Sequence, residues 1–390
     1  MRRGHVGRTI GEILAEVDQR LEWAQIRFKE AKESGLKVIG LYCGYIPFEL
    51  VRAVGAIPVS LCGSDADAIP SAELELPRNF CPLIKSSYGL AITDTCPFFH
   101  FADALIGETT CDGKKKVFEL LARLRPVHVM QLPYDKNAPG ALDQWRSEMK
   151  RVSEFLVGVT GIEPTPERLS AEIYYENELR RVLQRIVRTF ERPVPSLTWT
   201  QMLSVRSLTD FVVDRAPYLA LIEELAEAVS VADAAVGDAS TSGRMPRVLV
   251  TGSPMSPETN KVMRIAEESG ALVVAHDACS GTKMFDRLVD EEGDPLDALT
   301  RYTLYIPCAC MSPNDGRVDL LRSSVSTYGV EGVIDTVWQA CHTFNVESVI
   351  VQRACREELN VPCLKIETDY SAADEGQLRT RIEAFVEQML

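Results

Sequence analysis

The stretch Val38–Leu61, VIGLYCGYIPFELVRAVGAIPVSL, decides the fold of this chain. The apolar residues 38–41 and 57–61 are each typical of a short buried strand. Between the two strands, Pro47 stands at the first turn of a predicted helix and Gly55 stands where that helix stops. Two strands joined by a helix are the unit from which a parallel sheet covered by helices is built.

The same alternation of strands and helices extends to about residue 139 and returns from residue 247 onward. Before the first strand, hydrophobic periodicity predicts an amphipathic helix over 9–34. Further along, we expect strands at 104–107 and 127–132, with a helix at 114–124 between them. The middle of the chain has a different pattern. It predicts long helices over 141–157, 167–190 and 208–231, with one clear break at Arg192–Pro195. A loop is predicted to follow at 233–245.

The returning pattern echoes the first one. The segments 248–254, 257–258 and 268–274 parallel residues 38–44, 47–49 and 53–59. We therefore expect an α/β fold with two similar flavodoxin-like parallel-sheet lobes and helical segments between them. The expected parts are an N-terminal helical segment 1–36, an N-lobe 37–139, a helical insert or linker 140–245 and a C-lobe 246–390. A ligand would then bind in the cleft between the lobes, at the carboxyl ends of both sheets.

Composition limits the kind of partner. The net charge of −14 argues against a nucleic-acid partner, because phosphate binding needs a basic surface. The first ten residues carry basic side chains without an apolar segment behind them, so no signal peptide is predicted. No apolar run approaches the ~18 residues that a membrane span needs. We therefore expect a cytoplasmic protein with no membrane partner.

The eleven cysteines carry the most chemical information. Their odd number, in a chain of 390 residues without a signal peptide, argues against a disulfide framework. Strand ends beside helix N-termini favour negative charge, such as a thiolate or a sulfide-rich cluster held by several thiolates. Six cysteines are predicted to follow strand ends, namely Cys43, Cys81, Cys111, Cys279, Cys308 and Cys341. The sequence therefore predicts an iron–sulfur protein.

Other interpretations of these residues are less well supported. No two cysteines show the paired spacing of a zinc ribbon or the tight run of a ferredoxin, so the ligands would be distant in sequence. A free cysteine is by default a buried packing residue, and Cys62, Cys355 and Cys363 fit that role. Residues 107–115 resemble a phosphate loop, but they have five residues between the glycines and Lys115 where Ser or Thr should hold magnesium. No nucleotide site is predicted.

Four segments resemble the 2-hydroxyacyl-CoA dehydratase and benzoyl-CoA reductase family, and within it the double-cubane cluster branch. They are 40–50, 79–89, 109–116 and the tail 366–385. The most specific are CDGKKK at 111–116 and LPRNFCPLIKSS at 76–87. The resemblance covers nearly the whole chain.

The resemblance implies a cofactor and a partner. Dehydratases of the family hold one [4Fe-4S] cubane by three cysteines and receive low-potential electrons from an ATP-hydrolysing iron–sulfur activator. The double-cubane branch holds an [8Fe-9S] unit with three cysteines per cubane. For this chain, the resemblance implies an N-lobe set of Cys43, Cys81 and Cys111, with Cys96 as a substitute. It implies a C-lobe set of Cys279, Cys308 and Cys341, with Cys310 as the spare. The catalytic residues stay unknown.

We therefore expect an anaerobic iron–sulfur oxidoreductase, a homodimer, that is reduced by the activator and passes electrons to a small-molecule substrate. Lys85 and Lys114–Lys116 either offset the cluster charge, form a docking surface or belong to a solvated helix face. Two alternatives stay open. One is a dehydratase subunit, a lyase, with a single [4Fe-4S] cluster, and the other is a non-catalytic sensor or storage protein. The substrate cannot be named from the sequence.

Overall fold

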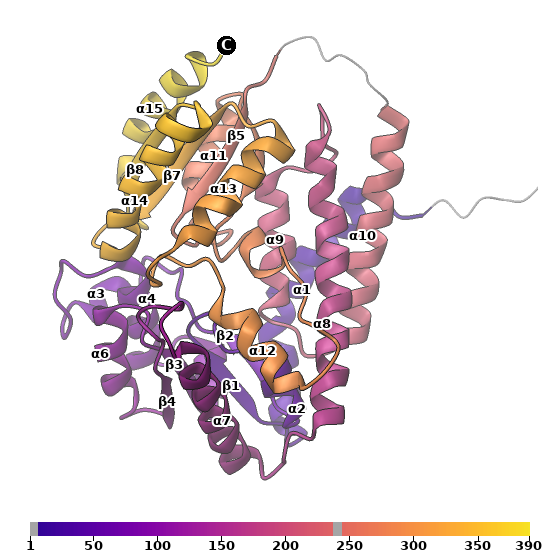
Figure 1. Ribbon diagram of the computed structural model, residues 1–390, viewed down its shortest axis with the longest axis vertical. Helices are drawn as coiled ribbons and strands as arrows, with labels where there is room; N and C mark the ends of the chain where they lie inside the picture. The colour runs from indigo at the N-terminus through magenta and orange to yellow at the C-terminus, as the bar shows by residue number, and fades with distance from the viewer. Residues whose placement is uncertain (1–6, 237–243) are drawn as a thin grey trace, which may run out of the picture.

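The computed structural model describes residues 7–236 and 244–390, which form two parallel four-stranded sheets. The first sheet has the order β2-β1-β3-β4 and the second has the order β6-β5-β7-β8. The strands of the first sheet are β1 (Val38–Leu41), β2 (Ile57–Ser60), β3 (Ala104–Glu108) and β4 (Val127–Met130). Those of the second are β5 (Arg247–Gly252), β6 (Leu272–His276), β7 (Gly332–Trp338) and β8 (Cys363–Thr368). The identical order confirms the predicted α/β fold with two similar lobes. Figure 1 shows the first sheet in the lower part of the molecule and the second sheet in the upper part.

The N-lobe sheet is flanked by helices that begin at polar or proline residues. The long helix α1 (Ile10–Glu33) precedes the sheet and starts with a capping box. The Thr9 hydroxyl accepts a hydrogen bond from the Glu12 backbone N–H, and the Glu12 carboxylate accepts one from the Thr9 backbone N–H. Pro82 opens α4 (Pro82–Ile92) and Pro97 opens α5 (Pro97–Phe101), as expected for proline in the first turn. The remaining helices of this lobe are α2 (Phe48–Ala53), α3 (Ile69–Ala72) and α6 (Asp112–Leu121).

The middle of the chain is helical, but its breaks differ from those predicted. It contains α7 (Ala141–Thr160), α8 (Pro166–Val187) with a 3₁₀ turn at Arg188–Glu191, α9 (Trp199–Thr209) and α10 (Arg215–Val236). The single helix predicted over 208–231 is wrong, because α9 ends and α10 begins within it. Residues 211–213 between the two helices are apolar and pack into the cores, so the hydrophobic pattern runs through the break. The loop predicted at 233–245 is helical up to Val236, and 237–243 lie outside the described residues.

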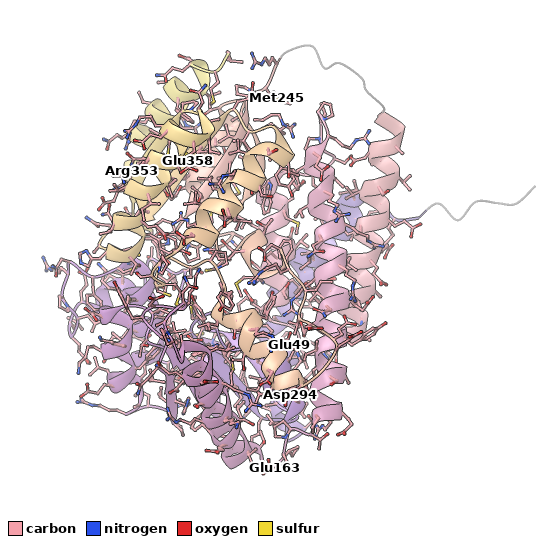
Figure 2. The ribbon with its side chains drawn as sticks, viewed as in Figure 1. Glu49, Glu163, Met245, Asp294, Arg353 and Glu358 are labelled. Atoms are coloured by element: carbon pink, nitrogen blue, oxygen red, sulfur yellow. The ribbon has the colours of Figure 1, made fainter. Side chains whose placement is uncertain are left out.

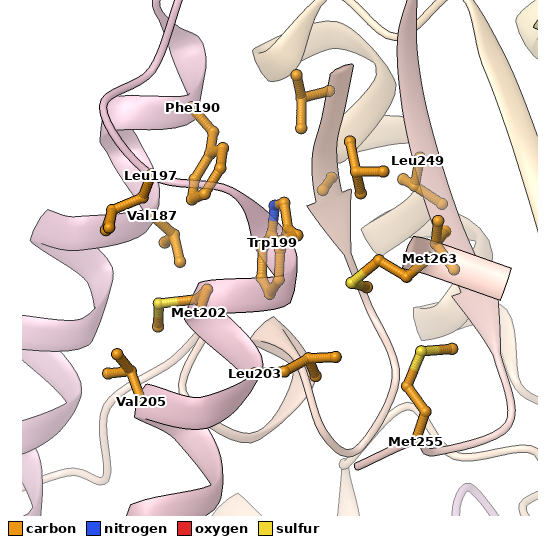
Figure 3. Close-up of a cluster of buried hydrophobic side chains, with 14 of the residues drawn as sticks. Val187, Phe190, Leu197, Trp199, Met202, Leu203, Val205, Leu249, Met255 and Met263 are labelled. Carbon is orange, nitrogen blue, oxygen red and sulfur yellow. The ribbon is translucent and has the colours of Figure 1, made fainter. Parts of the chain in front are cut away.

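Helix α9 joins the helical middle to the C-lobe. Thr198 and Gln201 form a capping box at its start. Trp199 is 1% exposed, stacks on Phe190 with ring centroids 5.4 Å apart, and belongs to the same core as Leu249 of β5 (Figure 3). Burying an aromatic side chain of this size stabilises the fold by roughly 1.5–3 kcal/mol. The C-lobe therefore shares its core with the helical middle.

One segment of the C-lobe half of the chain crosses back to the N-lobe. Helix α12 (Pro295–Leu304) packs against α7 and α8, and its buried residues belong to the N-lobe core. The Trp145 indole of α7 donates to the Thr303 hydroxyl at 2.9 Å. In Figure 2, Asp294 before α12 and Glu49 of α2 both lie in the lower part of the molecule, far from Arg353. This crossing places residues 305–311 between the lobes.

The remaining helices surround the second sheet. They are α11 (Lys261–Glu268), a 3₁₀ turn at Thr282–Met284, α13 (Asp315–Tyr328), α14 (His342–Ala354), a π-helical turn at Cys355–Leu359, a 3₁₀ turn at Ala372–Asp374 and α15 (Glu375–Glu387). Across 7–236 and 244–390, no helix is both long and apolar enough to span a membrane.

Candidate cluster-binding site

Cysteines from both lobes gather where loops leave the carboxyl ends of the strands. Cys43 follows β1, Cys111 follows β3, Cys279 follows β6 and Cys341 follows β7. Two of the six predicted positions are not strand ends: Cys81 follows a turn after α3, and Cys308 follows helix α12. Cys81, Cys111 and Cys341 are the N-cap residues of α4, α6 and α14. Their sulfurs therefore lie at the positive ends of helix dipoles, where a thiolate is stabilised.

One group of thiols combines the two lobes. The Cys81 thiol forms a hydrogen bond with Cys341, which lowers the pKa of Cys341 to about 6 and raises that of Cys81. Backbone N–H of Phe344, in the first turn of α14, also favours the Cys341 thiolate. Burial raises the pKa of Cys111, and the nearby Cys341 adds to that shift. Cys81, Cys111 and Cys341 therefore form group one, with two cysteines from the N-lobe and one from the C-lobe.

A second group forms around Cys308. Hydrogen bonds from Cys279 and Cys310 lower the pKa of Cys308, while the same bonds raise the pKa of both donors. Burial raises the pKa of Cys43, and the proximity of Cys308 adds to the shift. The Tyr45 hydroxyl lies 3.4 Å from the Cys310 sulfur. Cys43, Cys279, Cys308 and Cys310 therefore form group two, again with members from both lobes.

A glycine lets the two halves of group two approach. A Cβ at Gly44 would lie 2.5 Å from the terminal methyl carbon of Met284, which is closer than real Cβ contacts. The loop that carries Cys43 therefore packs directly on the turn that follows Cys279. Any larger residue at 44 would have to displace Met284.

The two groups of thiols differ from the N-lobe and C-lobe sets of cysteines that the resemblance implied. The resemblance implied Cys43 with Cys81 and Cys111, whereas in the structure Cys43 lies with the C-lobe cysteines and Cys341 lies with Cys81 and Cys111. The physical reason is that the lobes face each other. The segment after α12 reaches the end of β1, and the N-terminus of α14 reaches the start of α4.

Four cysteines belong to neither group. Cys96 is the N-cap residue of α5, and its sulfur accepts from the Phe99 backbone at 3.4 Å. Cys62 is exposed, so its predicted role as a buried packing residue is wrong; its thiol donates to the Tyr42 carbonyl at 3.4 Å and lies near Lys114. Cys355 and Cys363 contact each other at the beginning of β8. All eleven cysteines fall within the described residues, and all are free thiols.

The lysines named from the sequence divide into buried and exposed ones. Lys114 is half-buried; its ammonium donates to the Tyr42 carbonyl and lies near Cys43 and Cys111. Burial works against its charge, but the nearby thiols outweigh burial and raise its pKa. Lys115 and Lys116 instead face solvent, paired with Asp112 and Glu119. Lys85 is buried and paired with Glu73.

Two charged residues of the site had not been predicted. Glu108 at the end of β3 is fully buried; one carboxyl oxygen accepts from the Ile46 backbone at 3.1 Å and the other has no partner among the described residues. Burial raises its pKa to about 7. Lys283 is 1% exposed and lies near Cys279 and Cys308. No periodicity or motif distinguishes either residue in the sequence, because their roles depend on loops from both lobes.

The donor set fits an iron–sulfur cluster better than a single ion. Within the described ranges, no three His, Cys, Asp or Glu side chains gather closely enough to hold one metal ion. The thiols are spread over two groups of three and four, and thiolates are the ligands that iron–sulfur clusters take. The helix N-termini and buried lysines supply the positive charge that such an anionic unit requires.

Comparison with known proteins gives consistent matches. Residues 43–389 match the family described as 2-hydroxyglutaryl-CoA dehydratase, D-component. The chain is 40% identical to YjiM of Escherichia coli K12, which is provisionally named a dehydratase subunit, over 97% of this chain and 99% of that protein. It is 22% identical to the beta subunit of the lactoyl-CoA dehydratase of Anaerotignum propionicum, over 92% and 93% of the two chains. It is 21% identical to one of the subunits of the benzoyl-CoA reductase of Thauera aromatica, over 93% of each.

Proposed function

Because the chain belongs to the 2-hydroxyglutaryl-CoA dehydratase D-component family, whose relatives are named as dehydratase and reductase subunits, we propose that it is an iron–sulfur reductase component with a cluster between its lobes. The observation that carries this proposal is the meeting of thiols from both lobes in two adjacent groups. When bound, such a cluster supplies single electrons at low potential.

The two groups favour a double cubane. Cys81, Cys111 and Cys341 would hold one half. Cys43 and Cys308 would hold the other half together with Cys279 or Cys310. Three thiols on each side are what an [8Fe-9S] unit with three cysteines per cubane requires, whereas a single [4Fe-4S] cluster would leave one group without a role.

The chain's own residues would prepare this site in three ways. The N-termini of α4, α6 and α14 stabilise thiolates at their capping cysteines. Lys114 offsets negative charge from within the N-lobe. Buried Tyr42 and Tyr45 help to exclude water around Cys43.

The energy for reduction would come from a partner. The segment that resembles a phosphate loop in sequence is the end of β3 and the start of α6, and the thiol of Cys111 rather than a phosphate caps that helix. We therefore propose an ATP-dependent iron–sulfur activator as electron donor, a small-molecule substrate, a cytoplasmic location and a homodimer. The division into the parts 1–36, 37–139, 140–245 and 246–390 stays part of this proposal.

A dehydratase subunit with one [4Fe-4S] cluster is the second candidate, because relatives are named as beta subunits of acyl-CoA dehydratases. Iron and acid-labile sulfide in the anaerobically purified full chain distinguish the two. We expect about twice the iron of a one-cubane subunit and bleaching in air. The iron of one cubane would favour the dehydratase subunit, and zinc alone would refute both candidates.

A further inference from the structure

Lys283 is a buried lysine whose ammonium nitrogen has no hydrogen-bond partner among the residues the structure describes. It lies in the 3₁₀ turn Thr282–Met284 and is 1% exposed. Two other buried lysines do have a partner, because Lys85 donates to Glu73 and Lys261 donates to Asp374, and the half-buried Lys114 donates to the Tyr42 carbonyl. A buried ammonium with no acceptor is costly, so its retention indicates a ligand that would accept from it.

The neighbours of Lys283 show where that ligand would lie. Its charge lies close enough to Cys279 and Cys308 to be stabilised by their thiolates. The ammonium is 5.7 Å from the centre of the Phe344 ring, and Phe344 stands in the first turn of α14, which Cys341 caps. Lys283 therefore lies beside group two and faces the helix that carries a thiol of group one.

The nearby charged residues do not satisfy it. Arg317 shares the Phe344 ring but donates to Glu347 and to the Thr251 hydroxyl. Asp277 is 1% exposed, and both of its carboxyl oxygens also lack a hydrogen-bond partner in the described part of the chain, so it does not pair with Lys283. No acceptor among the described residues therefore takes a hydrogen bond from the Lys283 ammonium, which lies beside Cys279 and Cys308.

We propose that Lys283 is a positioning residue that donates hydrogen bonds to sulfur atoms of a cluster bound at Cys279 and Cys308, and that its charge raises the reduction potential of that cluster. This inference rests on the proposed function. Net charge and hydrogen bonds to sulfur are the features that tune cluster potentials. A positive charge in a low-dielectric site stabilises the form that has gained an electron.

The test is a potentiometric titration, followed by electron paramagnetic resonance, of the full chain purified anaerobically. Lys283→Met removes charge and donors, Lys283→Gln keeps donors without charge, and Lys283→Arg keeps the charge. Lys261→Met removes a buried lysine that is paired with Asp374 in the same lobe, and it serves as the matched control.

We expect Lys283→Met and Lys283→Gln to keep their iron and to shift toward lower potential. The ratio of reduced to oxidised cluster should fall at least tenfold, which is about 59 mV for a one-electron couple. Lys283→Arg and Lys261→Met should stay at the wild-type potential. A wild-type potential in an iron-replete Lys283→Gln variant, or an equal shift in Lys261→Met, would overturn the inference while leaving the proposed function intact. Absence of any cluster from the wild-type chain would overturn the proposed function itself.

Discussion

The thiol of Cys81, at the start of an N-lobe helix, lies beside the sulfur of Cys341, at the start of a C-lobe helix, and each changes the pKa of the other. The contact crosses from one parallel sheet domain to the other. A cluster ligated here would therefore be shared by the lobes, and losing one ligand would weaken the contact between them as well as the cluster.

The first prediction separates ligands from packing residues. Changing Cys111 or Cys341 to Ser should remove iron or convert the cluster, because both belong to group one. Cys62→Ser and Cys363→Ser are controls outside both groups; both should keep full iron, and Cys363→Ser should cost only ~1 kcal/mol of unfolding free energy. Iron per chain, measured anaerobically, checks this. Full iron in all four variants would show that the division of the cysteines is wrong.

The second prediction concerns how α1 is fixed to the N-lobe sheet. Asp103 accepts from the Val38 backbone at 2.9 Å and pairs with Lys32 and Lys37. Burial opposes its charge, but these bonds outweigh burial and lower the pKa of Asp103. Asp103→Asn should reduce the unfolding free energy by about 1–2 kcal/mol at neutral pH.

The pH dependence of the stabilisation by Asp103 follows from the direction of its pKa shift. The folded pKa of Asp103 lies below its unfolded value, so its stabilisation is complete above pH ~4 and is lost as the pH falls through the folded pKa. Denaturant titrations at several pH values should show the difference between wild type and Asp103→Asn shrinking in acid. Asp319→Asn, which removes an exposed ion pair with Arg322, should change stability little at any pH. A difference that stays constant down to pH ~3 would contradict the assignment.

Strands β1 to β6 could be predicted, because buried parallel strands are short apolar runs bounded by Pro and Gly, whereas no strand is predicted at β7 or β8. The start of α9 could have been found from its Thr198–Gln201 capping box. Its end could not, because the apolar residues 211–213 continue the hydrophobic pattern from α9 into α10. The grouping of the thiols could not be predicted, because sequence distance does not show that α12 crosses to the N-lobe. Lys283 gave no signal for the same reason.

The third prediction concerns the two exposed lysines of the run 114–116. Lys115 and Lys116 face solvent beside Cys111, so the pair is a candidate docking edge for an electron donor. Lys115→Glu with Lys116→Glu should slow electron transfer from the activator, with a larger effect at low salt, while the cluster spectrum stays unchanged. Lys150→Glu, a solvent-facing change on α7, is the control. Equal rates for the two proteins at low salt would place the docking surface elsewhere.

The last prediction is that the chain alone does not turn over with ATP, but reduces small unsaturated or nitrogen-containing molecules when an ATP-dependent iron–sulfur activator and a strong reductant are supplied. The reason is that the end of β3 leads into a helix capped by a thiol, so it offers no phosphate loop, while two groups of partly buried thiols suit a cluster of low potential. Energy from ATP must then enter through a protein contact. Phosphate release and substrate loss should be measured with and without the activator, using Cys341→Ser as the control that lacks an intact cluster. ATP hydrolysis by the purified chain, or substrate reduction that is indifferent to the activator, would refute this prediction.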